Sequence, residues 1–545
     1  MPAANAVRCQ PTCSNGRLIV MDRARFAASG KSFAVATPHR AATDAAVAAF
    51  HAGGNSIDAA LAASAVLAVV YPHMCGIGGD LFALVTDRGS TVALNGSGAA
   101  ASALDADWVR REYGSMPVHG PLSVSVPGTV AAWNELATRF GRLSLAAAIA
   151  PAITLAQDGV PLAGSVARSI VKHQERLRQD AGISDLMLPG GRPLEIGQPL
   201  LQPALAATLR AIASAGSSAF YDGPVGSRLV AALASMGSRL TEADFRGHST
   251  EVTPPLAMAY RDLEVLVPPP NSQGFVLLEI LGCVERGRLT PDHLGPDAAT
   301  LAHIFRLASG DRDNFLADPR YAPVPIDDLL SADHAKELLD RAGQPPNATT
   351  VSRRATGDTV GIVAIQEGGP WVAINHSLYD AFGSGILEPS TGIICHNRGS
   401  YFSLDRSAPN FLVGSKRPAH TLMPVMVMRE GRPIVASATM GGSAHAQIHA
   451  ELLLAVLDRG ERPADAISRP RWLVGGLQRY GGPGIVAERR VPIEVVEKMV
   501  GAAFEVQMLD DWDEQVGHAQ MAARAPNGSL SAASDPRADG SAGAG

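Results

Sequence analysis

Residues 357–379 read GDTVGIVAIQEGGPWVAINHSLY, and the rest of the chain can be interpreted outward from them. Two apolar runs rich in Val and Ile flank a glycine-containing turn, a pattern that predicts two neighbouring strands. Thr359 opens the first strand, and the second run brings small hydroxyl and amide side chains, Ser377 among them, back beside it. The segment therefore predicts a threonine at the start of an apolar strand with polar neighbours.

Such a threonine is a candidate nucleophile if the chain is cut immediately before it. The cut frees an α-amine whose unperturbed pKa is about 8, so the amine could take the proton of the Thr359 hydroxyl as a general base. By itself the pattern is a weak indication, because threonine is common at the start of strands. The remaining sequence has to strengthen this hypothesis.

Length and composition are typical of a large mixed globular protein. The 545 residues suggest roughly two to four domains or one large mixed domain, and a hydrophobic content of 46% can supply a sizeable core. The net charge of −6, without a long basic run, argues against nucleic acid and anionic membranes as partners. The most apolar stretch, residues 57–70, is too short to span a bilayer, and no secretory signal is visible. We therefore expect a cytoplasmic protein.

Three groups of residues could suggest a metal site, and each lacks a partner. Cys9 and Cys13 form a C-x3-C pair without the second pair of a zinc site, so we expect all five cysteines to be reduced thiols. His445 and His449 have helical spacing, but no glutamate follows His445 and no third ligand is evident. Residues 311–314, DRDN, lack the glycine and the final glutamate of a calcium loop, so we interpret them as a solvated helix face. We expect no metal and no cofactor.

The order of predicted elements indicates an α+β layered fold. Residues 1–33 look like a flexible lead-in, and a polar segment at 341–355 has the composition of a linker that ends just before the candidate cut. The Pro-rich segment 268–274 should form a surface or cleft loop, and the small, polar tail 538–545 should be frayed. Helices are expected at 41–52, 57–70, 104–113, 130–140, 143–157, 205–215, 447–458 and 464–469, and strands at 263–267, 360–366, 370–375, 393–396, 423–428 and 433–438.

Short motifs spread over nearly the whole chain carry a family likeness. The chain resembles gamma-glutamyltransferases and the related acylases, which are N-terminal-nucleophile hydrolases. Each motif is short, but their number and order make the resemblance specific. The motifs are 53–60 (GGNSIDAA), 76–79 (GIGG), 126–129 (VPGT), 220–223 (FYDG), the Pro-rich loop through Gly274, 318–319 (DP), 357–359 (GDT), 382–385 (FGSG), 416–418 (KRP), 441–442 (GG), 470–472 (PRW) and 533–537 (ASDPR).

The resemblance implies a four-layer αββα sandwich and autocatalytic cleavage between Asp358 and Thr359. The products would be a large subunit, residues 34–358 beyond the lead-in, and a small subunit, residues 359–545. In the precursor the Thr359 hydroxyl would attack the Asp358 carbonyl, and water would open the resulting ester. Thr359 would then supply both the nucleophile and the base.

The resemblance also assigns roles to three residues around the nucleophile. Ser377, where relatives carry a second threonine, would hydrogen-bond Thr359 and fix its rotamer; an ordinary strand-end serine is the alternative. Gly441 and Gly442 match a glycine pair whose backbone N–H groups form the oxyanion hole, although a plain strand-to-helix turn is the other interpretation. Glycine suits the oxyanion hole because a side chain would obstruct the oxyanion, and one such donor contributes about 3 kcal/mol.

The sequence departs from the family where relatives grip the substrate. Segment 94–98, LNGSG, matches the place of an arginine that holds a glutamyl α-carboxylate, so Ser97 or a neighbour stands there instead. Residues 398–401, RGSY, follow Asn397 without the carboxylate that would grip the α-ammonium. The family's paired serines and a frequent asparagine are also replaced. The candidate substrate-binding residues at these positions are Tyr379, Asn397, Arg398, Tyr401, His420 and Thr421.

These departures change the expected substrate. A buried α-ammonium needs an anion or several acceptors, so a pocket that contains Arg398 and lacks the acid suits an anionic acyl group without an amine. Examples are a dicarboxylic mono-amide, an oxamate-like ion or a glutaryl group, whose carboxylate Arg398 would clamp. The other interpretation is a surface arginine paired with a nearby carboxylate.

The sequence thus predicts a self-processing amidohydrolase or acyltransferase that acts on a small amide whose acyl part carries a carboxylate. Water is the expected acceptor of the acyl group, and an amine is the other possible acceptor. One alternative is an orthodox gamma-glutamyltransferase or glutathione hydrolase that recognises the α-amine by other residues. A second alternative is an unprocessed relative that acts as a binding protein, against which the presence of Thr359, Ser377 and the glycine pair argues.

Overall fold

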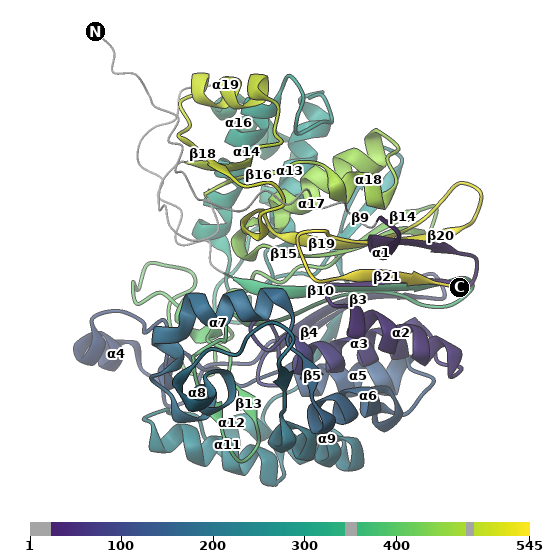
Figure 1. Cartoon of the computed structure of the whole chain (residues 1–545). Coiled ribbons are helices and arrows are strands. Elements are labelled where there is room, and N and C mark those ends of the chain that lie inside the picture. Colours follow the sequence, from purple (N-terminus) through teal and green to yellow (C-terminus); the bar gives the residue numbers. More distant parts are fainter. Residues whose placement is uncertain (1–22, 344–356, 476–483) are drawn as a thin grey trace.

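The computed structural model describes residues 23–343, 357–475 and 484–545, and its centre is a pair of stacked β-sheets (Figure 1). Each sheet has seven strands, in the orders β21-β2-β10-β11-β3-β4-β7 and β1-β20-β19-β15-β14-β9-β8. Helices cover the outer face of each sheet, so the chain forms four layers (Figure 1). The expected αββα sandwich is confirmed.

Both sheets combine strands from before and after Thr359, so the two expected subunits build one sandwich rather than separate domains. The first sheet contains β2 (Phe33–Thr37), β3 (Asp80–Asp87), β4 (Ser90–Gly96), β7 (Glu251–Thr253), β10 (Asp358–Gln366), β11 (Trp371–Tyr379) and β21 (Ser541–Ala544). The second contains β1 (Ala27–Gly30), β8 (Leu256–Tyr260), β9 (Leu263–Val267), β14 (Val425–Arg429), β15 (Arg432–Met440), β19 (His518–Arg524) and β20 (Leu530–Ser534).

The helices fall into two layers and a rim. On the first sheet lie α2 (Arg40–His51), α3 (Ser56–Val70), α5 (Thr129–Phe140) and α6 (Leu145–Asp158). On the second lie α13 (Gly274–Arg286) and α17 (His445–Leu453), with α14 (Ala298–Phe315) and α16 (Ala332–Ala342) packed on α13. The other helices are α1 (Arg23–Phe26), α4 (Ala106–Tyr113), α7 (Gly164–Leu177), α8 (Ala181–Met187), α9 (Pro203–Ala215), α10 (Ser218–Tyr221), α11 (Pro224–Ser235), α12 (Glu242–Arg246), α15 (Ile326–Leu329), α18 (Pro463–Ser468) and α19 (Ile493–Gly501).

Most predicted elements lie within a few residues of the observed ones. The strand expected at 263–267 is β9, and the strands expected at 360–366 and 370–375 are β10 and β11. β11 runs on to Tyr379, so Ser377 lies inside a strand instead of at its end. The helix expected at 447–458 begins at His445 as α17 and finishes with a π-helical turn, Leu454–Asp458.

Half of the buried residues in the layer between the two sheets are alanines. Ala36, Ala373, Ala438 and Ala532 are all buried there. A Cβ added to Gly361 on β10 would lie 2.6 Å from the carbonyl oxygen of Ala438 on β15. The sheets therefore approach closely at the strand that follows Thr359, which fixes the position of the strand relative to β15.

Two predictions about the chain ends need correction. The tail expected to be frayed contains β21, which pairs antiparallel with β2 at the edge of the first sheet. Its small residues suit this place because a Cβ on Gly543 would already lie 2.6 Å from Val47 of α2. The lead-in expected through residue 33 contains α1, β1 and the start of β2, whereas residues 1–22, with Cys9 and Cys13, lie outside the described part. Most of the expected linker, residues 344–355, lies outside it as well.

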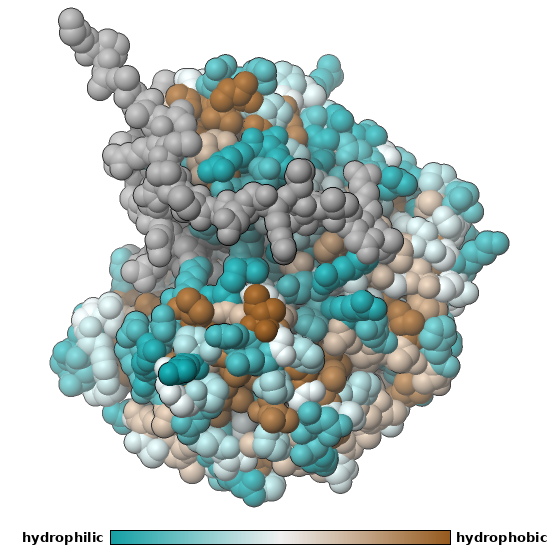
Figure 2. Space-filling view, viewed as in Figure 1, coloured by the Kyte–Doolittle hydropathy of each residue, from teal (hydrophilic) through white to brown (hydrophobic). Residues whose placement is uncertain are grey.

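The face of the molecule in Figure 2 shows hydrophobic residues in small groups among hydrophilic ones. Within the described ranges, none of the helices is both long enough and apolar enough to cross a membrane. α3 is the most apolar in appearance, but all of its residues are buried inside the protein. Its N-terminus is fixed by a capping box between Asn55 and Asp58 from the GGNSIDAA motif.

Candidate active site

Thr359 lies at the start of β10, buried and beside the hydroxyl of Ser377 on β11. Thr359 Oγ1 donates to Ser377 Oγ at 3.1 Å. Ser377 Oγ in turn donates to the carbonyl oxygen of Asp358 at 2.7 Å and accepts from the backbone N–H of Tyr379 at 2.8 Å. The serine therefore bridges the hydroxyl of Thr359 and the carbonyl group that precedes it in the chain.

The side chain of Asp358 is held in an unusual electrostatic environment. Burial, together with the negative charge of Asp380, raises the pKa of the Asp358 carboxyl to about 7. Asp358 pairs with Tyr379 across the two strands, and the strand register is irregular between Asp358 and Val360. The bond between Asp358 and Thr359 thus lies at a break in regular pairing, next to two acidic groups.

Gly441 and Gly442 follow β15 and come to lie against the residues just before Thr359. A Cβ added to Gly357 would lie 2.7 Å from the Cα of Gly442 and 3.4 Å from its backbone nitrogen. Gly442 has a φ of 53°, which favours glycine, and a Cβ on Gly441 would lie 2.4 Å from Ile448. The backbone of Gly442 therefore lies against Gly357, Gly441 has no room for a side chain, and the positive φ of Gly442 favours glycine.

Two buried side chains that sequence reasoning did not select hold this glycine loop. Gln273 Nε2 donates to the carbonyl oxygens of Gly442, at 3.0 Å, and Thr421, at 2.8 Å. Arg312 Nη1 donates to the carbonyl oxygen of Ser443 at 2.9 Å. Gln273 ends the Pro-rich segment, which was expected to be a surface or cleft loop, and it is fully buried.

Arg312 also corrects the interpretation of residues 311–314 as a solvated helix face. These residues lie in α14, where Asp311 and Arg312 are 7% and 2% exposed. Asp311 contacts His334 of α16, and Arg312 turns toward the glycine loop. The helix face was misjudged because its apolar spacing is irregular and because Asp311 and Arg312 have partners in other elements, beside the pair that Arg312 forms with Asp313 in the same helix.

Arg398 is a buried cation whose guanidinium lies beside the ring of Tyr379. Its side chain is among the largest that are fully buried, and its guanidinium lies 3.8 Å from the centre of the Tyr379 ring. Arg398 Nη2 donates to Thr421 Oγ1 at 3.2 Å, while Nε and Nη1 have no hydrogen-bond partner in the described residues. Burial lowers the pKa of Arg398, and no carboxylate of those residues lies within ion-pair distance of it. The interpretation as a surface arginine paired with a carboxylate was therefore wrong.

Short structural links join Arg398 to Thr359. Tyr379 pairs with Asp358 across the strands, and its ring meets Tyr401 edge-on, with centroids 6.0 Å apart. Thr421, which contacts Arg398, is tied to Gly442 by the shared donor Gln273. The fold thus brings Thr359, the glycine pair and Arg398 into one site.

Two candidate substrate-binding residues already have other partners. Asn397 Nδ2 donates to Val118 O and to Asp380 Oδ2, both at 2.8 Å, and its Oδ1 accepts from the Asp380 N–H. His420 Nε2 lies 3.0 Å from Asp80 Oδ2, and its Nδ1 accepts from the Leu422 N–H. Both side chains are fully buried, so they support the pocket from behind.

The place expected for the family's arginine holds a neutral network. Asn95 Oδ1 accepts from the hydroxyl of Ser97 at 2.6 Å, and Asn95 Nδ2 donates to Asn271 Oδ1 at 2.8 Å. Asn271 Nδ2 donates to Ser97 Oγ at 3.2 Å. These side chains satisfy one another, so this position carries no charge of its own.

Comparison with known proteins agrees with this architecture. The family model for gamma-glutamyltranspeptidase matches residues 42–545. The Glutathione hydrolase-like YwrD proenzyme of Bacillus subtilis (strain 168) is 36% identical over 513 residues, which cover 93% of this chain and 97% of the relative. The Oxamate amidohydrolase proenzyme of Klebsiella pneumoniae is 35% identical over 518 residues, with the same two coverages, 93% and 97%.

Solved structures give the same result. A cephalosporin acylase from Bacillus halodurans has a TM-score of 0.88 at 31% identity and covers 99% of both chains. Gamma-glutamyltranspeptidase of Helicobacter pylori has a TM-score of 0.52 at 27% identity, over 58% of this chain and 92% of that one. The chain therefore belongs to the gamma-glutamyltranspeptidase family of N-terminal-nucleophile hydrolases, on the side of its amidohydrolases and acylases, and is an enzyme.

Proposed function

We propose that the chain cuts itself between Asp358 and Thr359 and then acts as an N-terminal-threonine amidohydrolase. The observation that supports the cut is the Ser377 hydroxyl, which contacts both Thr359 Oγ1 and the Asp358 carbonyl oxygen. Thr359 Oγ1 attacks the Asp358 carbonyl carbon, and Ser377 passes the hydroxyl proton toward the carbonyl oxygen. The proton then moves from that oxygen to the Thr359 nitrogen as the C–N bond breaks, so that the nitrogen leaves as a neutral amine and an ester remains. Water hydrolyses the ester to the Asp358 α-carboxylate and the free Thr359 hydroxyl.

After the cut, the α-amine of Thr359 serves as the general base. It takes the hydroxyl proton while Thr359 Oγ1 attacks the amide carbonyl of the substrate, and it later protonates the leaving amine. The N–H groups of Gly441 and Gly442 would stabilise the oxyanion, each by about 3 kcal/mol. Water then attacks the acyl-enzyme, which releases a carboxylic acid and restores Thr359.

We further propose that the acyl part of the substrate carries a carboxylate that Arg398 binds. A buried guanidinium with two unpartnered nitrogen atoms is costly unless an anion reaches it, and a carboxylate matches its planar fork. Tyr379 orients the guanidinium by stacking, and Thr421 holds its remaining nitrogen. One relative is named oxamate amidohydrolase, and oxamate is a small amide with such a carboxylate.

A second candidate is hydrolysis of a gamma-glutamyl amide such as glutathione, because some relatives are named glutathione hydrolase or glutathione hydrolase-like. The observation that favours it is Asp380, a carboxylate near the pocket that already accepts a hydrogen bond from Asn397. In that case Arg398 would hold the α-carboxylate of the glutamyl group and Asp380 its α-ammonium. An unprocessed binding protein is the third reading, and it requires Thr359 to remain inside an intact chain.

The first test is the intact mass of the purified protein, compared with Thr359→Ala and with Thr154→Ala, a matched change at an exposed position on α6. We expect wild type and T154A to give two fragments, the smaller starting at Thr359, and T359A to stay whole. An uncut chain in all three proteins would show that no free α-amine forms at Thr359. It would favour the hypothesis of an unprocessed binding protein. Turnover of oxamate, glutaryl anilide and gamma-glutamyl anilide then separates the substrate classes, because a clear preference for the L-glutamyl group would contradict the carboxylate-only pocket.

A further inference from the structure

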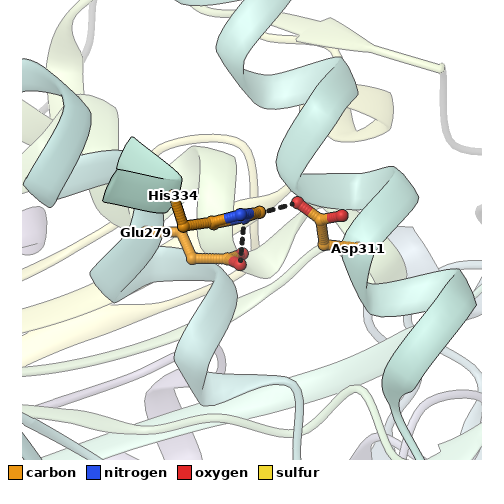
Figure 3. Close-up of side chains that lie close together, drawn as sticks. All are labelled: Glu279, Asp311 and His334. Atoms are coloured by element: carbon orange, nitrogen blue, oxygen red, sulfur yellow. Dashed lines mark hydrogen bonds and ion pairs between the residues drawn. The ribbon is translucent and has the colours of Figure 1, made fainter. Parts of the chain in front are cut away.

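Three potential ligand side chains meet between α13, α14 and α16, away from the active-site pocket (Figure 3). His334 of α16 lies between the carboxyl groups of Glu279 from α13 and Asp311 from α14. Its Nε2 is 3.1 Å from Asp311 Oδ2 and 3.5 Å from Glu279 Oε1. One atom from each side chain lies within 4.8 Å of the other two.

The buried carboxyl group of Glu279 is the main reason to expect a bound cation in this cluster. Its side chain points into the cluster, is 3% exposed as a residue, and neither carboxyl oxygen accepts a hydrogen bond from the described residues. Burial raises the pKa of Glu279 to about 8. A buried carboxyl group in this condition is expensive in free energy, and a bound cation would compensate it.

We propose that Glu279, Asp311 and His334 bind a divalent transition-metal ion, with Zn²⁺ as the type case. Zinc takes ligands at about 2.0–2.2 Å in a tetrahedron, so its ligand atoms lie roughly 3.3 Å apart, close to the two separations observed. The imidazole favours such ions over Mg²⁺ or Ca²⁺, which prefer oxygen ligands alone.

A proton on His334 is the competing occupant of the cluster. The contact with Glu279 raises the pKa of His334 to about 9, so without the ion the imidazolium would sit between the two carboxyl groups. Arg286 on α13 and Glu337 and Arg341 on α16 are the other charged groups that face the cluster.

The site would hold together the helices that support the glycine loop. Gln273, at the N-terminus of α13, donates to Gly442 O, and Arg312, next to Asp311 on α14, donates to Ser443 O. An ion bound by all three helices would therefore limit the motion of both donors. Its role is structural, because none of its ligands contacts Thr359 or Arg398.

The test uses the full, untagged chain in its T359A form as well as wild type, so that binding is measured independently of self-cleavage. After treatment with a chelator, titration with ZnCl2 is followed by calorimetry, and MgCl2 serves as the comparison. We expect one Zn²⁺ per chain and weak or absent binding of Mg²⁺, because the imidazole of His334 favours Zn²⁺. Zinc at 100 times its Kd should stabilise the fold by about 2.7 kcal/mol.

Variants place the ion. His334→Gln and Glu279→Gln should each weaken zinc binding at least 100-fold, while Asp340→Asn, an exposed change on the same helix as His334, should leave it unchanged. Undiminished binding by H334Q would put the ion elsewhere and overturn the proposal. No binding to wild type up to millimolar zinc would overturn it too, and this result needs no variant to fold.

Discussion

Two regions of this molecule bury arginines, and they treat the charge in opposite ways. Near the C-terminus, Arg537 lies between Glu488 and Asp535, with nitrogen–oxygen distances of 2.7 and 3.0 Å, and Arg471 reaches Asp535 at 2.7 Å. All four side chains are at most 1% exposed. In the pocket beside Thr359, Arg398 is equally buried and has a hydroxyl and an aromatic ring instead of a carboxylate.

We interpret Arg537 and Arg471 as structural charges, and we propose that Arg398 binds a ligand. Breaking a buried pair is costly because one charge remains uncompensated, so the C-terminal cluster should matter for folding. In the proposed function Arg398 bears that cost in the free protein, and a substrate carboxylate would compensate its charge as Glu488 and Asp535 compensate Arg537 in the folded chain. The following changes test this contrast, in order of decreasing effect.

Asp535→Asn should produce the largest change, a loss of about 3–5 kcal/mol in the free energy of unfolding. The pKa of Asp535 is lowered because Arg471 and Arg537 together outweigh the opposing effect of its burial, so the stability it contributes is present above the ordinary aspartate pKa and disappears as the pH falls below it. Urea unfolding at pH 7 measures the loss. Asp510→Asn, which opens an exposed pair with Arg489, is the control and should change stability by less than about 1 kcal/mol. Equal losses in both variants would contradict the role given to the buried cluster.

Arg398→Met should reduce kcat/KM for an acyl-carboxylate amide by about 100- to 1,000-fold, or about 2.7–4 kcal/mol, because the substrate carboxylate would be buried without a partner. The free energy of unfolding should stay the same or rise, since an uncompensated charge is removed. Steady-state kinetics and urea unfolding of the same sample check both statements. Arg398→Lys keeps the positive charge without the planar guanidinium, so its kcat/KM should lie between those of wild type and R398M. A stability loss as large as that of D535N would show that Arg398 is a structural charge.

Asp358→Asn extends the comparison from buried arginines to two neighbouring acidic residues, Asp358 and Asp380. Because the pKa of Asp358 is raised to about 7, the folded chain prefers the protonated form, and its stability falls as the pH rises from about 4 through 7. In the uncut T359A chain, D358N should remove this loss and add about 1–3 kcal/mol at pH 8, but little at pH 4.5. Thermal unfolding at the two pH values measures the effect, and a gain of equal size at both would rule out the charge as its cause.

Arg490→Gln should have the smallest effect, about 0.5–1 kcal/mol. Arg490 lies at the rim of the C-terminal cluster, partly exposed, where it stacks on Trp512 and pairs with Glu488 at 2.8 Å. Glu488 keeps its hydrogen bonds to Arg537 when Arg490 is changed, so no buried charge is left without a partner. Urea unfolding again provides the measurement, and a loss above 3 kcal/mol would extend the buried cluster to its rim.

Sequence reasoning succeeded where local pattern carries the information. Alternation and turn residues predicted β9, β10 and β14, and apolar spacing predicted α3 and α5. It failed for β21, because a short run of small residues becomes a strand only when a sheet edge accepts its hydrogen bonds. It failed likewise for residues 311–314, whose partners come from α16 and from the glycine loop.

The candidate site divides along the same line. The spacing from Thr359 to Ser377 is set by two adjacent strands and their turn, so their contact was predictable and is present at 3.1 Å. Gln273 escaped notice because a loop glutamine gives no signal until its amide is seen between Gly442 and Thr421. Residues 470–472 and 533–537 were noted as separate motifs, and only the folded chain joins them through Arg471 and Asp535.

The sequence alone therefore determined the layered α+β class, the strand pair that presents Thr359 and the arginine that replaces the expected acid after Asn397. These follow from periodicity, turn chemistry and residue type, which act over short distances along the chain. Only the tertiary structure decided that Arg398 is buried without a carboxylate, whereas Arg537 is buried between two. The reason is physical: the cost of a buried charge depends on which side chains surround it, and those come from distant parts of the chain.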